Sequence, residues 1–150
     1  MRYKHIMVAF DGSNTSNLAL QEAIQLGKDQ KAKLRVIYVV DETVVNYMGG
    51  YVDLDALWGA YKAEGRDLLN KIKEEVKKSK IDFETSLVEL KPFEGRLAEK
   101  IVAEAKAWPA DLLVIGTHGR HGISHFFLGS VAESVVRIAT MPVLLIRGEG

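Results

Sequence analysis

The sequence predicts an α/β fold, in which a five-stranded parallel sheet is covered by helices on both faces, as in Rossmann-like domains. Three observations carry this prediction. Apolar runs and helical patterns alternate strictly along the chain, with short links between them. The apolar runs are mostly continuous, which is typical of strands buried on both faces of a parallel sheet. The length of 150 residues, 47% of them hydrophobic, fits a single domain over residues 1–150.

In the first part of the chain, two strands flank a helix. Ile6–Phe10 is an apolar run that stops at Asp11-Gly12-Ser13, and we expect the first strand there. The polar residues 13–16 are candidate caps for a helix whose apolar positions recur at helical spacing, with Gly27 near its end. Leu34–Val40 is rich in β-branched residues and predicts the second strand.

The rest of the chain continues this alternation. Residues 43–53 break the pattern around two adjacent glycines and predict a loop. We expect a long helix over 54–78, a strand over 83–90, and a helix that starts near residue 97 and ends before Pro109. Residues 111–115 predict the fourth strand, 131–139 the last helix and 143–146 the final strand. Trp58 and Trp108 lie in helical patterns, so we interpret them as packing residues.

Composition and charge narrow the range of functions. Lys plus Arg and Asp plus Glu number 20 each, which leaves no electrostatic signature of binding to nucleic acid or to a membrane surface. The absence of cysteine excludes disulfides, thiolate zinc sites and cysteine nucleophiles. No apolar run approaches the roughly 18–20 residues that span a bilayer. An apolar strand directly after Met1–His5 leaves no room for a signal peptide, so we expect a cytoplasmic protein.

The most informative stretch is Gly116-Thr117-His118-Gly119, which is followed, after nine intervening residues, by Gly129-Ser130-Val131. A buried strand that opens into a glycine-rich loop and leads into a helix start is a common phosphate-binding arrangement, because the N–H groups of the first helical turn are unpaired. The spacing G-x2-G-x9-G-S differs from the Walker A motif and from the dinucleotide fingerprint. From the residues alone, phosphate binding and a tight glycine turn both remain open.

Topology brings three groups to one edge of the predicted sheet. In such folds ligands lie beyond the carboxyl ends of the strands, where the strand order reverses. Asp11 follows the first strand, residues 39–41 end the second, and residues 116–119 follow the fourth. Asp11 has two interpretations: a hydrogen bond to a ribose hydroxyl or a place near a metal, and a cap on the next helix.

Two other chemistries are weaker. His118, His121 and His125 have the spacing H-x2-H-x3-H, which could hold zinc or nickel. No cysteine or nearby carboxylate completes such a site, so we expect no metal centre on these histidines. The G-x-S-x-G pattern of serine hydrolases is absent, and we assign no catalytic residue.

Taken together, the chain resembles the single-domain universal stress proteins over essentially its whole length. The resemblance rests on four stretches: Val8–Ser13, Gly116–Arg120, Leu128–Glu133 and Met141–Leu145. It implies an adenine-nucleotide-binding type of fold. In that family the G-x2-G-x9-G-[ST] signature marks the branch that binds ATP, so the resemblance implies ATP as the ligand, with Mg²⁺ as an optional companion.

The resemblance also implies roles for individual residues. Ala9 and Asp11 would line the nucleoside, Val39 would meet the adenine through its backbone, and the glycine loop and the start of the last helix would hold the phosphates. The residues assigned in this way are Ala9, Asp11, Val39, Gly116, His118, Gly119, Gly129, Ser130, Val131 and Ala132. The chain departs from the family pattern only inside the loop, at His121, His125 and Phe126-Phe127.

The resemblance further implies a homodimer through the last strand. An apolar strand at a sheet edge needs a partner, and a two-fold pairing of Val143–Ile146 would supply one. We therefore expect an ATP-binding regulatory protein of the stress response, with little or slow hydrolysis. Two alternatives stay open: a Mg²⁺-dependent ATPase or nucleotidyl-transfer enzyme with the metal on Asp11 or Asp41, and a chaperone-like module that binds partners through residues 43–61.

Overall fold

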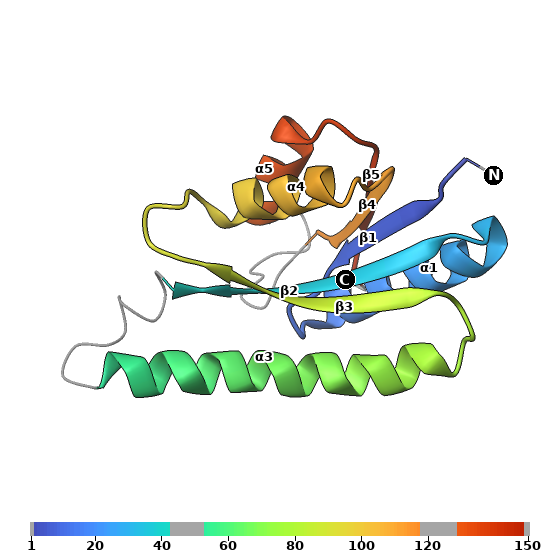
Figure 1. The fold of residues 1–150 in the computed structure, drawn as a ribbon. Helices are drawn as coiled ribbons and strands as arrows, with labels where there is room; N and C mark the ends of the chain where they lie inside the picture. Colours follow the sequence, from blue (N-terminus) through green and yellow to red (C-terminus); the bar gives the residue numbers. More distant parts are fainter. Residues whose placement is uncertain (1, 43–52, 118–128, 149–150) are drawn as a thin grey trace.

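A computed structural model describes residues 2–42, 53–117 and 129–148. Its strands form one sheet in the order β3-β2-β1-β4-β5, with every neighbouring pair parallel (Figure 1). In chain order the elements are β1 (His5–Ala9), α1 (Asn14–Gln30), β2 (Lys33–Asp41), α3 (Leu54–Lys77), β3 (Phe83–Leu90), α4 (Leu97–Ala107), β4 (Leu112–Gly116), α5 (Ser130–Ile138) and β5 (Val143–Ile146). The predicted five-stranded parallel sheet is therefore confirmed.

The helices lie in two layers, one on each face of the sheet. Figure 1 shows α1 and α3 below the sheet and α4 and α5 above it. Neighbouring residues of a strand point to opposite faces of the sheet. Ile6 and Val8 therefore join the core between the sheet and the helices α1 and α3, whereas Met7 joins the core between the sheet and the helices α4 and α5. All three side chains are fully buried. This burial on both faces explains why the strands appear in the sequence as continuous apolar runs.

The two tryptophans pack as the sequence predicts. Trp58 of α3 lies against the core below the sheet, and Trp108, which ends α4, lies against the core above it. The ring of Trp108 also meets His5 edge to face, with 5.0 Å between the ring centroids. Both rings are therefore engaged in packing between elements.

The helix α1 ends close to Gly27, as the sequence predicts. It continues past Gly27 to Gln30, and its last turn closes at Lys31, which adopts the left-handed conformation with φ 54°. Gly27 is buried inside the helix, where an added Cβ would lie 3.4 Å from the Cδ1 atom of Ile81. A Cβ there would therefore meet only ordinary van der Waals contact, and Lys31 supplies the left-handed end that glycine usually provides.

The order of the strands fixes where a ligand can lie. From β1 the chain builds outward to β2 and β3, and then crosses back to place β4 on the other side of β1. Val8 of β1 pairs with Val36 of β2 and with Val114 of β4. The strand order therefore reverses between β1 and β4, and the space beyond their carboxyl ends is the crevice that such sheets offer to ligands.

The strand β5 lies at the edge of this sheet. Pro142 O accepts the N–H of Leu113, and Ile146 O accepts the N–H of Thr117. Because backbone groups alternate in direction along a strand, Val143 and Leu145 direct theirs to the outer side. Within the described residues, no further strand pairs with that side.

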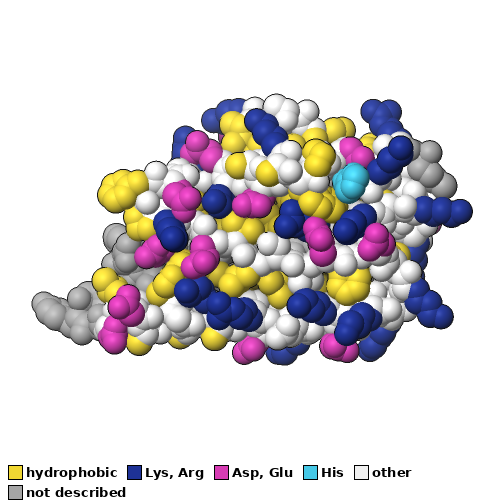
Figure 2. Space-filling model, in the orientation of Figure 1, with side chains coloured by type: hydrophobic (Ala, Val, Ile, Leu, Met, Phe, Trp, Pro, Cys, Tyr) yellow, Lys and Arg dark blue, Asp and Glu magenta, His cyan; other side chains and the backbone are white. Residues whose placement is uncertain are grey.

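Charges of both signs are interspersed on the face shown in Figure 2. The ion pairs Lys62–Glu89 (3.4 Å) and Arg35–Glu84 (3.2 Å) are examples that link α3 to β3 and β2 to β3. This mixture agrees with the equal numbers of acidic and basic residues in the chain. Among the residues described, no helix is long and apolar enough to cross a membrane.

Candidate functional site

The turn between β1 and α1 lies at the carboxyl end of β1, and polar side chains hold it in shape. Asp11 Oδ1 accepts the N–H of Ser13 at 2.9 Å, and Gly12 between them has φ +87°. Ser13 Oγ accepts the N–H of Ser16 at 3.2 Å and so caps α1. The Oγ atom of Ser16 in turn accepts the N–H of Asp11 at 3.3 Å. The helix cap is therefore Ser13, and Asp11 braces the turn in front of it.

Gly116, at the end of β4, lies directly against the start of α1. A Cβ at this position would come within 2.8 Å of Thr15 Oγ1 and 2.9 Å of Thr15 Cβ. Real Cβ atoms essentially never make such short contacts. Gly116 therefore allows β4 and α1 to pack closely, which is a structural reason for the first glycine of the signature that sequence reasoning missed.

Thr117 and Gly129, which stand before and after residues 118–128, lie next to each other at the carboxyl ends of β4 and β5. Thr117, only 5% exposed, donates its N–H to Ile146 O at 2.9 Å and accepts the N–H of Gly129 at 2.6 Å. Gly129 is thereby held next to the carboxyl ends of β4 and β5, although eleven residues separate it from Thr117 in the chain. This bond places the start of α5 at the crevice.

The first turn of α5 carries the backbone donors that an anion would use. Gly129 is the N-cap residue, with extended backbone (φ −61°, ψ 150°), and no side chain caps the helix among the residues described. The N–H groups of Ser130, Val131 and Ala132 belong to the turn whose donors lack partners within the helix. The positive end of the helix dipole adds to their attraction for an anion.

Three of the apolar residues that were assigned to the nucleotide site lie on one face of the sheet. Ala9 of β1, Val39 of β2 and Val131 of α5 are all partly buried, and all pack against the core that lies under α4 and α5. Asp11 and Gly129 follow β1 and precede α5, at the same edge of the sheet. The assigned residues that the structure describes thus bring apolar side chains, a carboxylate and a helix start to the same edge of the sheet, the edge formed by the carboxyl ends of its strands.

Two assigned residues, His118 and Gly119, lie outside the described part of the chain, as do His121 and His125. Within residues 2–42, 53–117 and 129–148, no group of three His, Cys, Asp or Glu side chains is arranged to hold a metal ion. Thr15 and Thr117 are the residues whose role the sequence did not reveal. Their only signal was a small hydroxyl side chain next to a glycine or a cap, which is common in loops.

A sequence model of the universal stress protein family matches residues 2–147. Universal stress protein MJ0531 of Methanocaldococcus jannaschii is 34% identical over 145 residues, which cover 97% of this chain and 82% of that protein. Universal stress protein YxiE of Bacillus subtilis is 32% identical over 152 residues, which cover 97% of this chain and 99% of that protein.

Solved structures agree with these matches. A universal stress protein family member from Burkholderia pseudomallei has a TM-score of 0.79 at 33% identity, covering 98% of both chains. A universal stress protein in complex with cAMP has a TM-score of 0.66 at 25% identity, covering 98% of both chains. A third, from Archaeoglobus fulgidus in complex with dAMP, shares the fold with a TM-score of 0.69 at 22% identity, covering 98% of this chain and all of that one. This chain belongs to the universal stress protein family.

Proposed function

We propose that this protein holds ATP in the crevice beyond β1 and β4 and acts as a nucleotide-binding regulator in the stress response, with little or slow hydrolysis. The observation that carries the proposal is the bond from Gly129 N–H to Thr117 O, which sets the uncapped start of α5 at the point where the strand order reverses. A helix start in that position offers backbone N–H donors to a phosphate chain.

The nucleoside end of the ligand is proposed from chemistry. Ala9 and Val39 are two of the apolar residues on the α5 side of the sheet, where an adenine ring would be shielded from water. Asp11 would accept a hydrogen bond from a ribose hydroxyl, since its negative charge disfavours a place beside phosphates. Gly116, His118 and Gly119 would border the phosphates, with Gly129, Ser130, Val131 and Ala132 as donors. Relatives whose structures contain cAMP and dAMP support an adenine nucleotide as the class of ligand.

We propose slow turnover because Asp11, the carboxylate that follows β1, already has a structural role. Asp11 already accepts the N–H of Ser13 and holds the turn, so it is not positioned as a general base by a second catalytic group. The enzymatic alternative, with Mg²⁺ on Asp11 or Asp41, predicts magnesium-dependent turnover of about 1–100 per second, as is typical of kinases. Release of phosphate no faster than uncatalysed hydrolysis would exclude that alternative.

Isothermal calorimetry with ATP tests the proposal. We expect Gly129→Val, which places a branched side chain beside the first-turn donors, and Asp11→Ala each to weaken binding at least about tenfold, the loss of one good hydrogen bond to a charged group. Gly59→Val and Asp67→Ala, at exposed positions on α3, are matched controls and should bind as the wild type does. Wild-type affinity in both crevice variants would refute the assignment, provided that their melting curves show folded protein.

The proposal includes a homodimer and a cytoplasmic location. The outward backbone groups of Val143 and Leu145 support pairing of two β5 strands about a two-fold axis, which would extend the sheet across both subunits. Sedimentation equilibrium measures the mass directly, and a monomer at all concentrations would contradict this part. The location is proposed because ATP is available there.

A further inference from the structure

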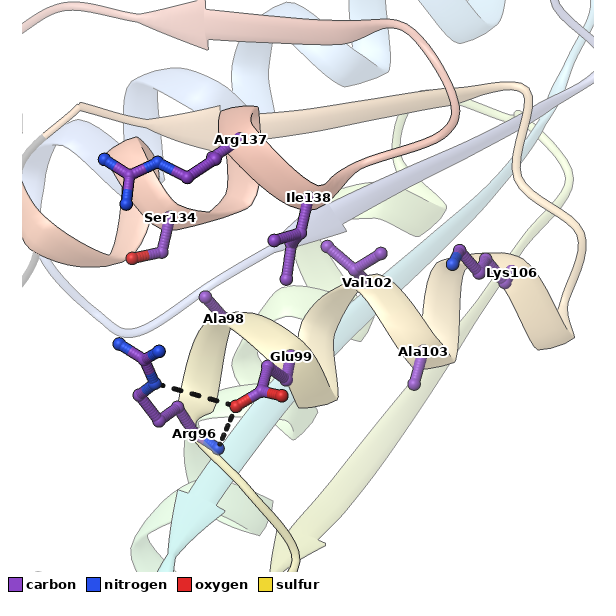
Figure 3. A pocket seen from close by; sticks show the side chains of 9 residues that line it. All are labelled: Arg96, Ala98, Glu99, Val102, Ala103, Lys106, Ser134, Arg137 and Ile138. Carbon is purple, nitrogen blue, oxygen red and sulfur yellow. Dashed lines mark hydrogen bonds and ion pairs between the residues drawn. The ribbon is translucent and has the colours of Figure 1, made fainter.

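A second concave site lies between α4 and α5, on the outer side of the helical layer. The hollow has a volume of about 360 Å³. Its apolar part comes from Ala98 and Val102 of α4, which are buried, and from Ile138 of α5, which is 39% exposed. Figure 3 shows Val102 and Ile138 pointing toward each other from the two helices. The site is thus an open groove with an apolar floor and no assigned role.

Positive charge borders this groove. Three cations and one carboxylate line it: Arg96, Lys106 and Arg137 with Glu99. Arg96 and Lys106 lie at opposite ends of α4, ten residues apart, which corresponds to about 15 Å along a helix (Figure 3). Arg137 contacts Glu133 at 3.0 Å, and Arg96 contacts Glu99 at 3.7 Å. Lys106 has no ion pair within the described parts of the chain.

We propose that the α4–α5 groove is a docking site for an acidic amphipathic helix of a partner protein, and that nucleotide in the crevice changes its affinity. The apolar floor suits the apolar stripe of a helix laid in the groove, and the cationic ends suit acidic residues about three turns apart. The choice of an acidic partner rests on charge complementarity, since the lining carries three positive charges and one negative charge. Arg96 and Arg137 are paired with Glu99 and Glu133, so the cation with no ion pair within the described residues is Lys106.

The coupling rests on the proposed function, and its route is the helix α5. This helix has only nine residues. Its first turn would hold the phosphates, and Ser134, Arg137 and Ile138 further along the same helix form one side of the groove. A short rigid helix that shifts when phosphate binds moves both ends together. By linkage, a partner that favours one position of α5 must then change ATP affinity by the same factor.

The test uses a defined probe. A fluorescein-labelled helical peptide of about twelve residues, with leucines on one face and glutamates at both ends, is titrated with the full-length protein and followed by anisotropy. The same peptide with lysines in place of the glutamates is the control for charge. We expect the acidic peptide to bind and the basic peptide to bind at least about tenfold more weakly, because like charges then face each other at both ends of the groove.

Charge-reversed proteins locate the site. The double variant Lys106→Glu/Arg137→Glu should weaken binding of the acidic peptide about tenfold or more. The double variant Lys71→Glu/Lys73→Glu makes the same change in net charge on exposed positions of α3, on the other face of the sheet, and should bind the peptide as the wild type does. No binding, equal binding of both peptides, or equal losses in both double variants would overturn the docking site.

The nucleotide arm separates this inference from the proposed function. An ATP concentration that just saturates the wild type should change its peptide affinity at least about fivefold, the lower range of typical allosteric couplings, and the same concentration should have a clearly smaller effect in Gly129→Val. Calorimetry on the groove variants should show ATP affinity unchanged in the absence of peptide. If ATP binds but leaves peptide affinity unchanged, the coupling is refuted and the proposed function stands. If the peptide binds but ATP does not, the proposed function and the coupling fail together and the groove stands.

Discussion

The crevice beyond β1 and β4 and the groove between α4 and α5 share the helix α5 but are built from different parts of the chain. The crevice is made of backbone and small residues, with Gly116 so close to Thr15 that no Cβ fits between them. The groove is made of side chains, and its charged groups are exposed, such as Arg96 and Glu99 at 85% and 54%.

This difference implies two kinds of sensitivity. A packed backbone site is strained by one added methyl group, because the surrounding elements cannot move apart without loss of their own contacts. Exposed ion pairs contribute at most about 1 kcal/mol each, because water screens them. We therefore expect the crevice to be strict about size and the groove to respond mainly to charge. The following predictions test this contrast, from the largest expected effect to the smallest.

The largest effect is expected for Gly116→Ala. The new Cβ would contact Thr15 below 3.0 Å, so we expect the free energy of unfolding to fall by about 2 kcal/mol and the melting temperature by about 4–8 °C. The matched control is Gly59→Ala, because nothing lies within 4 Å of a Cβ at Gly59. That variant should gain up to about 1 kcal/mol, since alanine favours a helix. Equal melting temperatures for Gly116→Ala and the wild type would contradict a strict crevice.

A smaller effect is expected for Ser13→Ala at the start of α1. Loss of the hydroxyl leaves the N–H of Ser16 without its acceptor, which should lower the free energy of unfolding by about 1 kcal/mol in urea titrations. Ser13→Thr keeps a hydroxyl in the same place and serves as the control, with a change of less than about 0.5 kcal/mol. If the alanine and threonine variants unfold at the same urea concentration, Ser13 does not cap α1 in solution.

The smallest effect on stability is expected for Glu94, in the turn between β3 and α4. The backbone N–H of Lys91 donates to the carboxylate of Glu94 at 2.8 Å, and this bond, with a smaller contribution from Lys100, lowers the pKa of Glu94. A carboxyl group whose pKa is lowered on folding stabilises the fold when it is ionised. That stabilisation is present above the ordinary pKa of 4.5 and is lost as the pH falls through the lowered value.

We therefore expect Glu94→Gln to reduce stability slightly at neutral pH and to equal the wild type in acid. Unfolding in urea at about pH 7 and about pH 3 measures the difference, on either side of the usual glutamate range. Glu22→Gln, at an exposed position on α1, is the control for loss of charge alone. A difference between Glu94→Gln and the wild type that persists unchanged in acid would show that the carboxylate does not carry the effect.

Much of the fold could be predicted from local patterns. Leu112–Ile115 was found because a strand buried on both faces needs apolar residues at every position. Val143–Ile146 was found because it is an equally continuous apolar run, although this edge strand is only partly buried. Gly27 was expected near the end of α1, and the helix does end three residues later, at Gln30. The left-handed conformation of Lys31 leaves no signal in the sequence, because glycine is the usual residue at such a position. The types of the elements thus followed from local sequence patterns, whereas the backbone conformation of Lys31 at the end of α1 did not.

Less of the candidate site could be predicted. The positions of Gly116 and Gly129 indicated the end of a strand and the start of a helix, and both are confirmed. The contact of Gly116 with Thr15 joins residues about one hundred positions apart, and no local pattern encodes it. The groove between α4 and α5 was also missed, because its lining residues look like the ordinary exposed sides of two amphipathic helices.

By itself, the sequence determined the alternation of strands and helices, the burial of the central strands β1 and β4, and a glycine signature that resembles one family. These features are local or compositional, because they depend on which residues follow one another and on how much apolar surface must leave water. Only the tertiary structure decided that β1 lies between β2 and β4, and that Thr117 reaches Gly129 beside β5. Any parallel strand offers the same backbone hydrogen bonds, so the choice of neighbours comes from the packing of the whole chain.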